Sequence, residues 1–441
     1  MNLKILKEIL LRNGCKNIYV KRLSPNDNSK NQVYLGGSFD ILNIFPTSEI
    51  ICDPKGNWEK DRFKASIKFC WITEAGSLVP APQSQLILYP KYPEVRLSGF
   101  LKGCPNAPSE LMASRLPDRL LFMAVSSRGE ILGYVTSGHS VLAAEFNQLH
   151  NLRMHGVFHI IEFVAEQDNR ARLLSEILRI HKTGWIKSKR LSASHEILPC
   201  IAPNCGGYTL EAELDITPNG FSEPDFLGYE IKQFHAANFN RFGSEVVTLM
   251  TPEPTEGFYV ESGIEAFIRK YGYKDKLGRP DRINFGGIHK VGKEHPETHL
   301  RLVLIGFDAS NNKITRVDGR ISLIDVKDNE AASWSFASLM THWNRKHNLA
   351  CYVPSQYTTI PTLQYRYGNN LIMGSGTNFL FFLNQMNAGN IYYDPGIKLE
   401  NASTKPTTKR RSQFRMKSGN IRNLYDTSEI IDILHLGHKS F

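Results

Sequence analysis

The chain has 441 residues, of which 41% are hydrophobic and 10% aromatic, so it can form packed cores and is not a disordered protein. No stretch approaches the ~18 consecutive apolar residues of a membrane helix, and the seven cysteines, an odd number spread along the chain, do not make a disulfide framework. The cysteine pattern favours a reducing, cytoplasmic setting. A net charge of +10, from 53 Lys and Arg against 43 Asp and Glu, favours a polyanionic partner.

The first part of the chain predicts one helix followed by short strands. In residues 1–14, Lys4, Lys7, Glu8 and Arg12 interrupt the apolar residues, which indicates an amphipathic helix and not a signal peptide. Many short strands separated by turn residues predict a small β-barrel or sandwich. The expected strands are 17–22, 32–35, 63–71, 84–88, 120–125 and 131–135.

The pattern then changes to one that mixes helices and strands. This order of elements favours an α/β domain with a mixed sheet. We therefore expect two domains, 1–165 and 166–441, with a boundary near residue 165. The expected helices are 141–151, 169–181, 208–214 and 334–345, the expected strands are 229–234, 245–250 and 299–307, and further elements are expected at 379–386 and 391–393.

The segment from Pro224 to Lys232 carries the clearest chemistry. Asp225 lies at an expected turn, and Glu230 and Lys232 lie two residues apart on an expected strand, so they share a face. Two carboxylates can hold Mg²⁺, which prefers oxygen ligands, polarises a phosphate and helps to form hydroxide from water. The lysine can orient that water and offset charge on the phosphorane. Glu211, on an upstream helix, could add a further carboxylate.

The default alternative for such a spacing is a surface salt bridge. Pro224 before the acid, Gly228 in the turn and the alternation along the strand favour a nuclease site instead. The two carboxylates should keep Lys232 charged, so a role as a base would require a metal to cancel them.

Residues 184–234 resemble the start of the MvaI/BcnI family of restriction endonucleases, a PD-(D/E)xK nuclease family. The matching segments are 184–185, 187–190, 209–211, 224–226 and 230–232, in the family's order and spacing. The resemblance implies that Asp225, Glu230 and Lys232 form the catalytic triad, with Mg²⁺ on Asp225 and Glu230, and that Glu211 is the helix carboxylate. The glycine-rich run at 204–207 departs from the family pattern.

Residues 19–27, 32–33 and 96–103 resemble the effector-binding domain of EcoRII, a B3-type DNA-binding pseudobarrel. Cations for phosphates and small polar groups for base edges occur together in these segments. Taken alone, the run 24–27 is more often a simple turn. The resemblance implies that the N-terminal DNA contacts are Lys21, Arg22, Ser24, Asn26, Asp27, Arg96 and Lys102.

A basic segment near the C-terminus has eight basic residues and one acidic residue between positions 398 and 422. MvaI-like enzymes place recognition residues there, where Arg can bind guanine and an acid can accept from cytosine N4. The alternative is a solvated tail. The candidate DNA contacts are Asp394, Lys398, Lys409, Arg410, Arg411 and Arg415.

Other sites are weaker candidates. Cys200, Cys205 and His195 suggest zinc, but no second cysteine pair completes such a site.

The two resemblances together predict a type IIE-like restriction endonuclease in the cytoplasm of a bacterium. It would act as a monomer by two successive nicks, with a second copy of the target on the N-terminal domain. Both families read CC-centred sites, so CCWGG is the first candidate and CCSGG the second. The alternatives are a DNA-binding protein without catalysis and a structure-specific repair nuclease.

Overall fold

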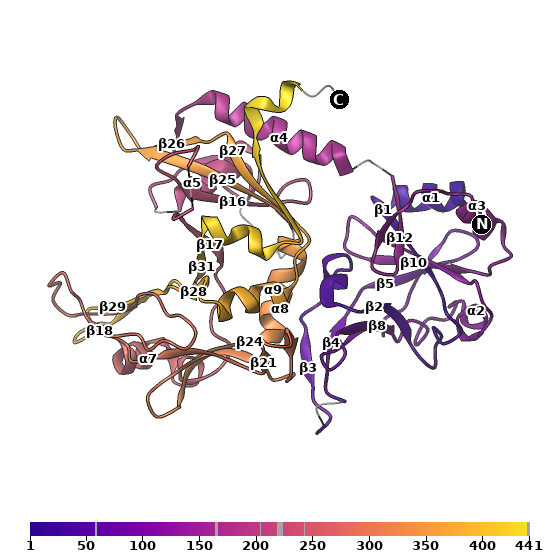
Figure 1. The fold of residues 1–441 in the computed structure, drawn as a ribbon, viewed down its shortest axis with the longest axis horizontal. Coiled ribbons are helices and arrows are strands. Elements are labelled where there is room, and N and C mark those ends of the chain that lie inside the picture. The colour runs from indigo at the N-terminus through magenta and orange to yellow at the C-terminus, as the bar shows by residue number, and fades with distance from the viewer. Residues whose placement is uncertain (58–59, 164–165, 203, 218–223, 242, 439–441) are drawn as a thin grey trace. The chain divides into compact units, whose positions relative to one another are not determined.

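The computed structural model describes residues 1–57, 60–163, 166–202, 204–217, 224–241 and 243–438 (Figure 1). The chain divides into two compact units, Met1–Asp168 and Asn169–Phe441. The boundary expected near residue 165 falls on residues outside the described ones. Within the described ranges, no helix is long and apolar enough to cross a membrane.

The first unit is built mainly of strands in two sheets. Its helices are α1 Leu3–Arg12, η1 Phe39–Asn43, α2 Ser109–Ala113 and α3 Val141–Asn147. One sheet has the order β11 (Arg153–His155), β12 (Phe158–Glu162), β1 (Asn17–Arg22), β9 (Leu120–Val125), β10 (Ile131–Thr136), β5 (Phe69–Ile72) and β6 (Leu78–Pro80). The other has the order β2 (Val33–Gly36), β8 (Glu94–Ser98), β7 (Gln85–Tyr89), β4 (Arg62–Ser66) and β3 (Ile51–Asp53). The described strands thus form two open sheets, and no closed barrel is found among them.

The N-terminal helix shows how the sequence pattern becomes packing in this unit. Asn2 caps α1 by accepting a hydrogen bond from the Ile5 N–H through its side chain. Leu6, Ile9 and Leu10 lie at helical spacing and are buried in the core between the helix and the seven-stranded sheet. The amphipathic pattern predicted from the sequence is therefore used to cover a sheet.

The second unit contains a mixed sheet and several smaller ones. Its helices are α4 Glu166–Thr183, α5 Cys205–Glu213, α6 Phe258–Glu261, α7 Gly263–Tyr271, α8 Phe336–His347, α9 Phe379–Asn387, η2 Ser418–Leu424 and η3 Ile433–His438. The mixed sheet runs β13 (Ile186–Lys187), β26 (Gln364–Tyr367), β25 (Leu349–Thr358), β27 (Asn370–Ser375) and β32 (Thr427–Asp432), and β16 (Glu230–His235) pairs with β25 in parallel.

The smaller sheets of this unit hold the other strands. They are β14 (Lys189–Leu191) with β15 (Ile197–Pro199); β17 (Val246–Met250), β31 (Phe414–Lys417) and β28 (Ile391–Tyr393); β18 (Tyr273–Lys274), β19 (Arg282–Gly286), β29 (Gly396–Glu400) and β30 (Thr407–Lys409); β20 (Arg301–Ile305), β23 (Arg320–Ile324) and β24 (Glu330–Ser335); and β21 (Phe307–Asp308) with β22 (Lys313–Ile314).

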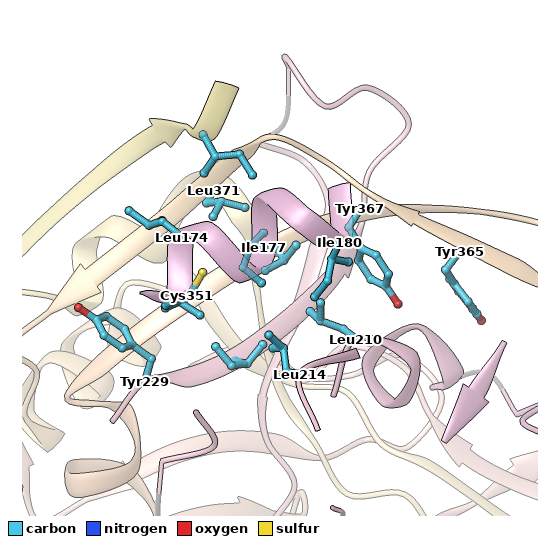
Figure 2. Close-up of a cluster of buried hydrophobic side chains, with 14 of the residues drawn as sticks. Leu174, Ile177, Ile180, Leu210, Leu214, Tyr229, Cys351, Tyr365, Tyr367 and Leu371 are labelled. Atoms are coloured by element: carbon cyan, nitrogen blue, oxygen red, sulfur yellow. The ribbon is translucent and has the colours of Figure 1, made fainter. Parts of the chain in front are cut away.

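One face of the mixed sheet is covered by α4 and α5, and Figure 2 shows the cluster between them. Ile177 and Ile180 from α4 and Leu210 from α5 are buried against Cys351 of β25. Since side chains alternate along a strand, Tyr352 points to the opposite face, where its hydroxyl bonds to that of Tyr425. The strand β16 has the same alternation, so Ile231 belongs to this core while Glu230 and Lys232 lie on the opposite face.

The structure corrects the element expected at 334–345. Residue Trp334 ends up on β24, paired with Ile321 of β23, and the helix α8 begins only at Phe336. The indole of Trp334 is fully buried, and its ring centroid lies 4.7 Å from that of Tyr393. The strand pairing and aromatic packing of Trp334 stabilise it in the sheet more than its local helical pattern stabilises it in a helix.

The structure also corrects the single strand expected at 63–71, since two separate strands lie there. Phe63 lies on β4 and Trp71 on β5, and these belong to different sheets of the first unit. The break occurs at Ile67, whose N–H donates to the Ser84 carbonyl.

Candidate active site

A tight turn before β16 brings Asp225 back onto the strand that follows it. Phe226 and Tyr229 exchange backbone hydrogen bonds of 2.9 and 2.8 Å, and Leu227 and Gly228 between them have φ values of +51° and +90°. Two central residues with positive φ define a primed hairpin turn, which favours glycine. The Asp225 Oδ2 then accepts the backbone N–H of a strand residue at 3.0 Å. Asp225 is thereby placed beside the start of β16.

Glu230 and Lys232 share one face of β16, as the sequence predicts. Glu230 is completely buried, and its Oε1 forms an ion pair with the Lys232 ammonium. Apart from lysine ammonium groups, no group among the described residues donates a hydrogen bond to the Glu230 carboxylate. A buried carboxylate without hydrogen bonds is costly unless cations compensate it. The charge of Glu230 is therefore met by ammonium groups.

A second lysine, Lys346, reaches the same carboxylates from α8. Its Nζ lies 3.5 Å from Glu230 Oε2 and 3.7 Å from Asp225 Oδ1. The parallel register explains this approach, because Glu230 pairs with Ala350 of β25, and α8 ends directly before that strand. Sequence reasoning missed Lys346, and no local spacing could have found it, because only the pairing of β16 with β25 brings it to the site.

Glu211 completes a set of three acidic side chains. Burial, followed by the charge of Asp225, raises the pKa of Glu211 to about 7. Burial and the charge of Glu230 raise the pKa of Asp225 to about 6. Burial by itself would lower the pKa of Lys232, but Glu230 and Asp225 outweigh it and raise that pKa above its ordinary value. Raised carboxylate pKa values indicate negative charges that lack enough compensation.

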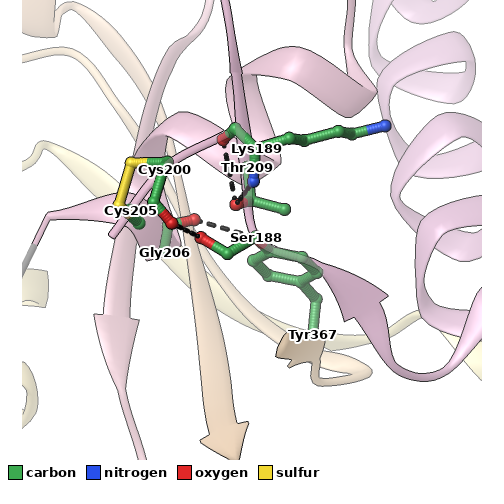
Figure 3. The surroundings of a disulfide bond; sticks show 7 residues. All are labelled: Ser188, Lys189, Cys200, Cys205, Gly206, Thr209 and Tyr367. Carbon is green, nitrogen blue, oxygen red and sulfur yellow. Dashed lines mark hydrogen bonds between the residues drawn. A yellow bond between two sulfur atoms is a disulfide. The ribbon is translucent and has the colours of Figure 1, made fainter. Parts of the chain in front are cut away.

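The start of α5, the helix that carries Glu211, is fixed by several contacts that Figure 3 shows. A disulfide joins Cys200 to Cys205, the first residue of the helix. The Thr209 side chain donates to the Lys189 carbonyl and accepts the Lys189 N–H, both at 3.1 Å. The Tyr367 hydroxyl donates to the Gly206 carbonyl at 2.8 Å. These contacts hold Glu211 in place relative to the sheet.

The disulfide differs from what the sequence predicts. Cysteines spread along a chain in a reducing setting are expected to stay reduced, whereas Cys200 and Cys205 are bonded to each other. His195, their expected companion in a zinc site, instead contacts Asp215 at 3.1 Å. Cysteines committed to a disulfide cannot serve as thiolate ligands, which agrees with the low weight given to zinc.

The carboxylates suit a hard divalent cation by their chemistry. Asp225, Glu230 and Glu211 offer oxygen donors of the kind that a hard cation prefers. Burial, and after it the charge of a neighbouring carboxylate, raises the pKa values of Asp225 and Glu211, and a bound cation would favour their ionised forms. In the arrangement described, no three His, Cys, Asp or Glu side chains are grouped so as to hold a metal ion. The oxygens of Asp225 and Glu230 face lysines instead.

Two of the predicted N-terminal DNA contacts form a buried pair. Lys21 Nζ lies 2.7 Å from Asp27 Oδ2, and both residues are buried. Asp27 also accepts the backbone N–H groups of Ser24 and Tyr34. The buried guanidinium of Arg119, which no sequence pattern singled out, donates to the carbonyls of Ser24 and Asp27. This geometry favours a structural role for Lys21 and Asp27, which hold the loop in shape.

The remaining N-terminal candidates fall into separate places. A groove of about 770 Å³ is lined by Lys21, Ser24, Asn26, Asp27, Lys30, Asn31, Gln32, Tyr34 and Arg96. Arg22 lies outside it, with its guanidinium over the Phe146 ring and bonded to Asn147 at 2.6 Å. Lys102 is exposed in the turn after β8 and does not line the groove. The structure thus groups Asn26 and Arg96 but not Arg22 or Lys102.

The C-terminal candidates lie on or beside strands of the second unit. Arg415 on β31 donates to Asp394 at 2.6 Å, so the acid and the arginine form a pair. Lys398 and Lys409 are opposite each other on β29 and β30, and Lys409 pairs with Glu400 at 3.1 Å. Burial and neighbouring cations lower the pKa of Lys398. Such a concentration of positive charge on one ladder favours an anionic ligand.

Arg410 and Arg411 follow β30 and are exposed. The Arg410 side chain lies within hydrogen-bonding distance of the Tyr259 hydroxyl, and the Arg411 carbonyl accepts the Gly396 N–H at 2.8 Å. The segment is therefore anchored to the second unit, although both arginines are exposed.

Comparison with known proteins identifies the family of the chain. The family model described as the MvaI/BcnI restriction endonuclease family matches residues 174–425, which confirms the resemblance drawn from the sequence. A solved complex of MvaI with its cognate DNA substrate aligns at 17% identity and a TM-score of 0.45, over 59% of this chain and 97% of MvaI. MvaI in the absence of DNA aligns at 17% identity and a TM-score of 0.34, over 62% and 100%.

A further solved structure is similar to part of the chain. The B3 domain of the UbaLAI restriction endonuclease with cognate DNA aligns at 17% identity and a TM-score of 0.24, over 36% of this chain and 96% of that domain. The sequence also suggests closeness to UbaLAI, and this B3 domain is among the structures found. No curated protein matches the chain.

Proposed function

Since the chain belongs to the MvaI/BcnI restriction endonuclease family, we propose that it is a Mg²⁺-dependent type II restriction endonuclease that hydrolyses phosphodiester bonds of double-stranded DNA. The observation that carries this proposal is the convergence of Asp225, Glu230 and Lys232 at the start of β16, with Glu211 beside them. A buried cluster of carboxylates with a charged lysine is what a metal-dependent phosphodiesterase requires.

Each residue of the cluster has a distinct role in the proposal. Asp225 and Glu230 hold the metal, and Glu211 supplies a further carboxylate from α5. When bound, Mg²⁺ polarises the phosphate and lowers the pKa of a coordinated water. Lys232, held by Glu230, orients the attacking water and offsets negative charge on the phosphorane. The raised pKa of Lys232 favours its ammonium form, which suits this electrostatic role.

The proposed target is a CC-centred site, with CCWGG as the first candidate and CCSGG as the second. The second unit would read this target with residues around Asp394, Lys398 and Arg415. The protein would act as a monomer that makes two successive nicks. The first unit would act as a B3-type effector domain that binds another copy of the target in its groove. Asn26 and Arg96 line that groove and are the side chains proposed for this contact.

Plasmid digestion tests the proposal against its two alternatives. The account predicts cleavage with Mg²⁺, none with EDTA, and ends that map by run-off sequencing to one short sequence. Binding without cleavage would indicate a DNA-binding protein, and ends that follow DNA structure in place of sequence would indicate a repair nuclease.

Neutralising Arg410 and Arg411 to glutamine should weaken DNA binding. If they contact phosphates, the slope of log K against log salt should fall by about one unit for each lost contact, for all sequences alike. If either reads a guanine, discrimination should fall by about 1–3 kcal/mol at one base pair. Titration of target and non-target duplexes at several salt concentrations measures both quantities.

Arg128→Gln is the matched control, because it removes an exposed cation from a turn of the first unit. Unchanged salt slope and unchanged discrimination in the Arg410/Arg411 variant would show that the pair belongs to a solvated segment.

A further inference from the structure

Lys346 faces the two residues to which the proposed function assigns the metal, and the inference that follows rests on that assignment. Its ammonium lies 3.5 Å from Glu230 Oε2 and 3.7 Å from Asp225 Oδ1. These two oxygens belong to different elements, the strand β16 and the turn before it. The Lys346 ammonium therefore lies beside both of the carboxylates that would hold the metal.

The two lysines of the site divide the oxygens of Glu230 between them. Lys232 pairs with Oε1, and Lys346 lies on the side of Oε2. Glu230 is completely buried, and apart from these two lysines no group among the described residues donates a hydrogen bond to its carboxylate. Removing the second ammonium without a replacement would therefore leave buried negative charge poorly compensated. In the absence of metal, Lys346 supplies that compensation.

The position of Lys346 in the fold allows its ammonium group to move away from the two carboxylates. It lies in the last turn of α8, and its side chain remains 24% exposed. A lysine has a compact charge on a flexible stem, and the carbonyl end of a helix is favourable for a cation. The ammonium can therefore move toward solvent or toward the helix end when another cation takes the carboxylates. Lys232 has a similar exposed fraction, 23%, but it starts from the middle of a paired strand and not from a helix end.

We propose that Lys346 is a positioning residue that occupies the metal position between Asp225 and Glu230 until a divalent cation displaces it. The lysine keeps the carboxylates together and neutralised in the metal-free protein, and it lowers the apparent affinity for metal because its displacement must accompany binding. A residue with this role opposes metal binding while it stabilises the metal-free fold. A merely structural lysine would do only the latter.

Calorimetric titration of the full-length chain with Ca²⁺, without DNA, tests this proposal. Ca²⁺ is an oxygen-seeking probe that requires no turnover. Lys346→Met should bind Ca²⁺ about tenfold more tightly than the wild type, which corresponds to about 1.4 kcal/mol. Lys346→Arg, which keeps the charge, should remain near the wild type. Lys270→Met, a control that removes an exposed lysine stacked on Phe258 in the same unit, should not change the affinity.

Thermal melting of the same variants gives a second readout. Metal-free Lys346→Met should melt below the wild type, and a fixed Ca²⁺ concentration should raise its Tm by more than it raises that of the wild type, because tighter binding gives greater stabilisation. Lys346→Gln, a second neutral variant, should behave in the same way. If either neutral variant is poorly folded without metal, the account requires that Ca²⁺ restore its folding.

Asp225→Asn separates failure of this inference from failure of the proposed function. It should lose most Ca²⁺ binding. If it binds Ca²⁺ like the wild type, the assignment of the metal ligands is wrong. If it loses binding while Lys346→Met binds Ca²⁺ with equal or weaker affinity than the wild type, the ligands stand and the role of Lys346 is overturned. Neutral variants that Ca²⁺ does not refold would overturn it as well.

Discussion

Alanine in place of Asp225 or Lys232 should lower the DNA cleavage rate by about three orders of magnitude, the equivalent of about 4 kcal/mol of transition-state stabilisation. Asp225 would no longer hold the metal, and Lys232 would no longer orient water or offset phosphorane charge. Single-turnover cleavage of a duplex carrying the target measures the loss. Binding of the same duplex should change only slightly, because neither side chain belongs to the recognition surfaces proposed on β29, β30 and β31.

His235→Ala provides the control on the same strand, since His235 is exposed at the end of β16. It should cleave at nearly the wild-type rate. Near-normal cleavage by the Asp225 or Lys232 variant would remove the assigned active site, and equal loss of binding and cleavage would indicate a folding defect in place of a catalytic one.

A cleavage-resistant oligonucleotide that carries the target should stimulate plasmid cleavage by the intact chain. Stimulation requires that the effector bind the active state more tightly than the inactive one, and about 1–3 kcal/mol of coupling would raise the rate by about 5–150-fold. Replacing Asn26 and Arg96 with alanine should remove the stimulation without removing cleavage, because both line the groove of the first unit. The initial rate at increasing oligonucleotide concentration is the quantity to measure.

Arg22→Ala is an informative comparison, because the structure places Arg22 over Phe146 and outside that groove. It should retain more stimulation than the Asn26/Arg96 variant. Should the Asn26/Arg96 variant fail to cut any substrate, the first unit would belong to the primary recognition surface, and the effector role would have to be abandoned.

The arrangement of Asp225, Glu230 and Lys232 could be predicted from the sequence because it depends only on one turn and the strand that follows it. Glu230 and Lys232 share a face as a result of strand alternation, and Gly228 marks the turn that returns Asp225 to the strand. Lys346 depends on the parallel pairing of β16 with β25, which no spacing within either segment reveals. Long-range strand pairing is what sequence patterns specify least.

Charged residues illustrate a second limit of prediction from sequence, since a sequence pattern does not show whether a charged side chain is buried. Lys21 and Asp27 have the composition of a DNA-contacting loop, yet they are buried and paired with each other. Whether a cation faces solvent or a partner depends on burial, and burial depends on the whole unit. The Cys200–Cys205 bond is similar, since a separation of five residues allows a disulfide without requiring one. The sequence predicts which residue types are available, and packing decides their use.

Run-off sequencing of plasmid DNA digested by the wild type and by Lys232→Ala, with Mg²⁺ and with EDTA, tests whether this chain is a metal-dependent, sequence-specific endonuclease. The wild type with Mg²⁺ should produce ends at one short CC-centred sequence. EDTA and the Lys232 variant should leave the plasmid intact. Cleavage in EDTA, ends scattered over unrelated sequences, or cutting by the Lys232 variant at the wild-type rate would show that the proposed function is wrong.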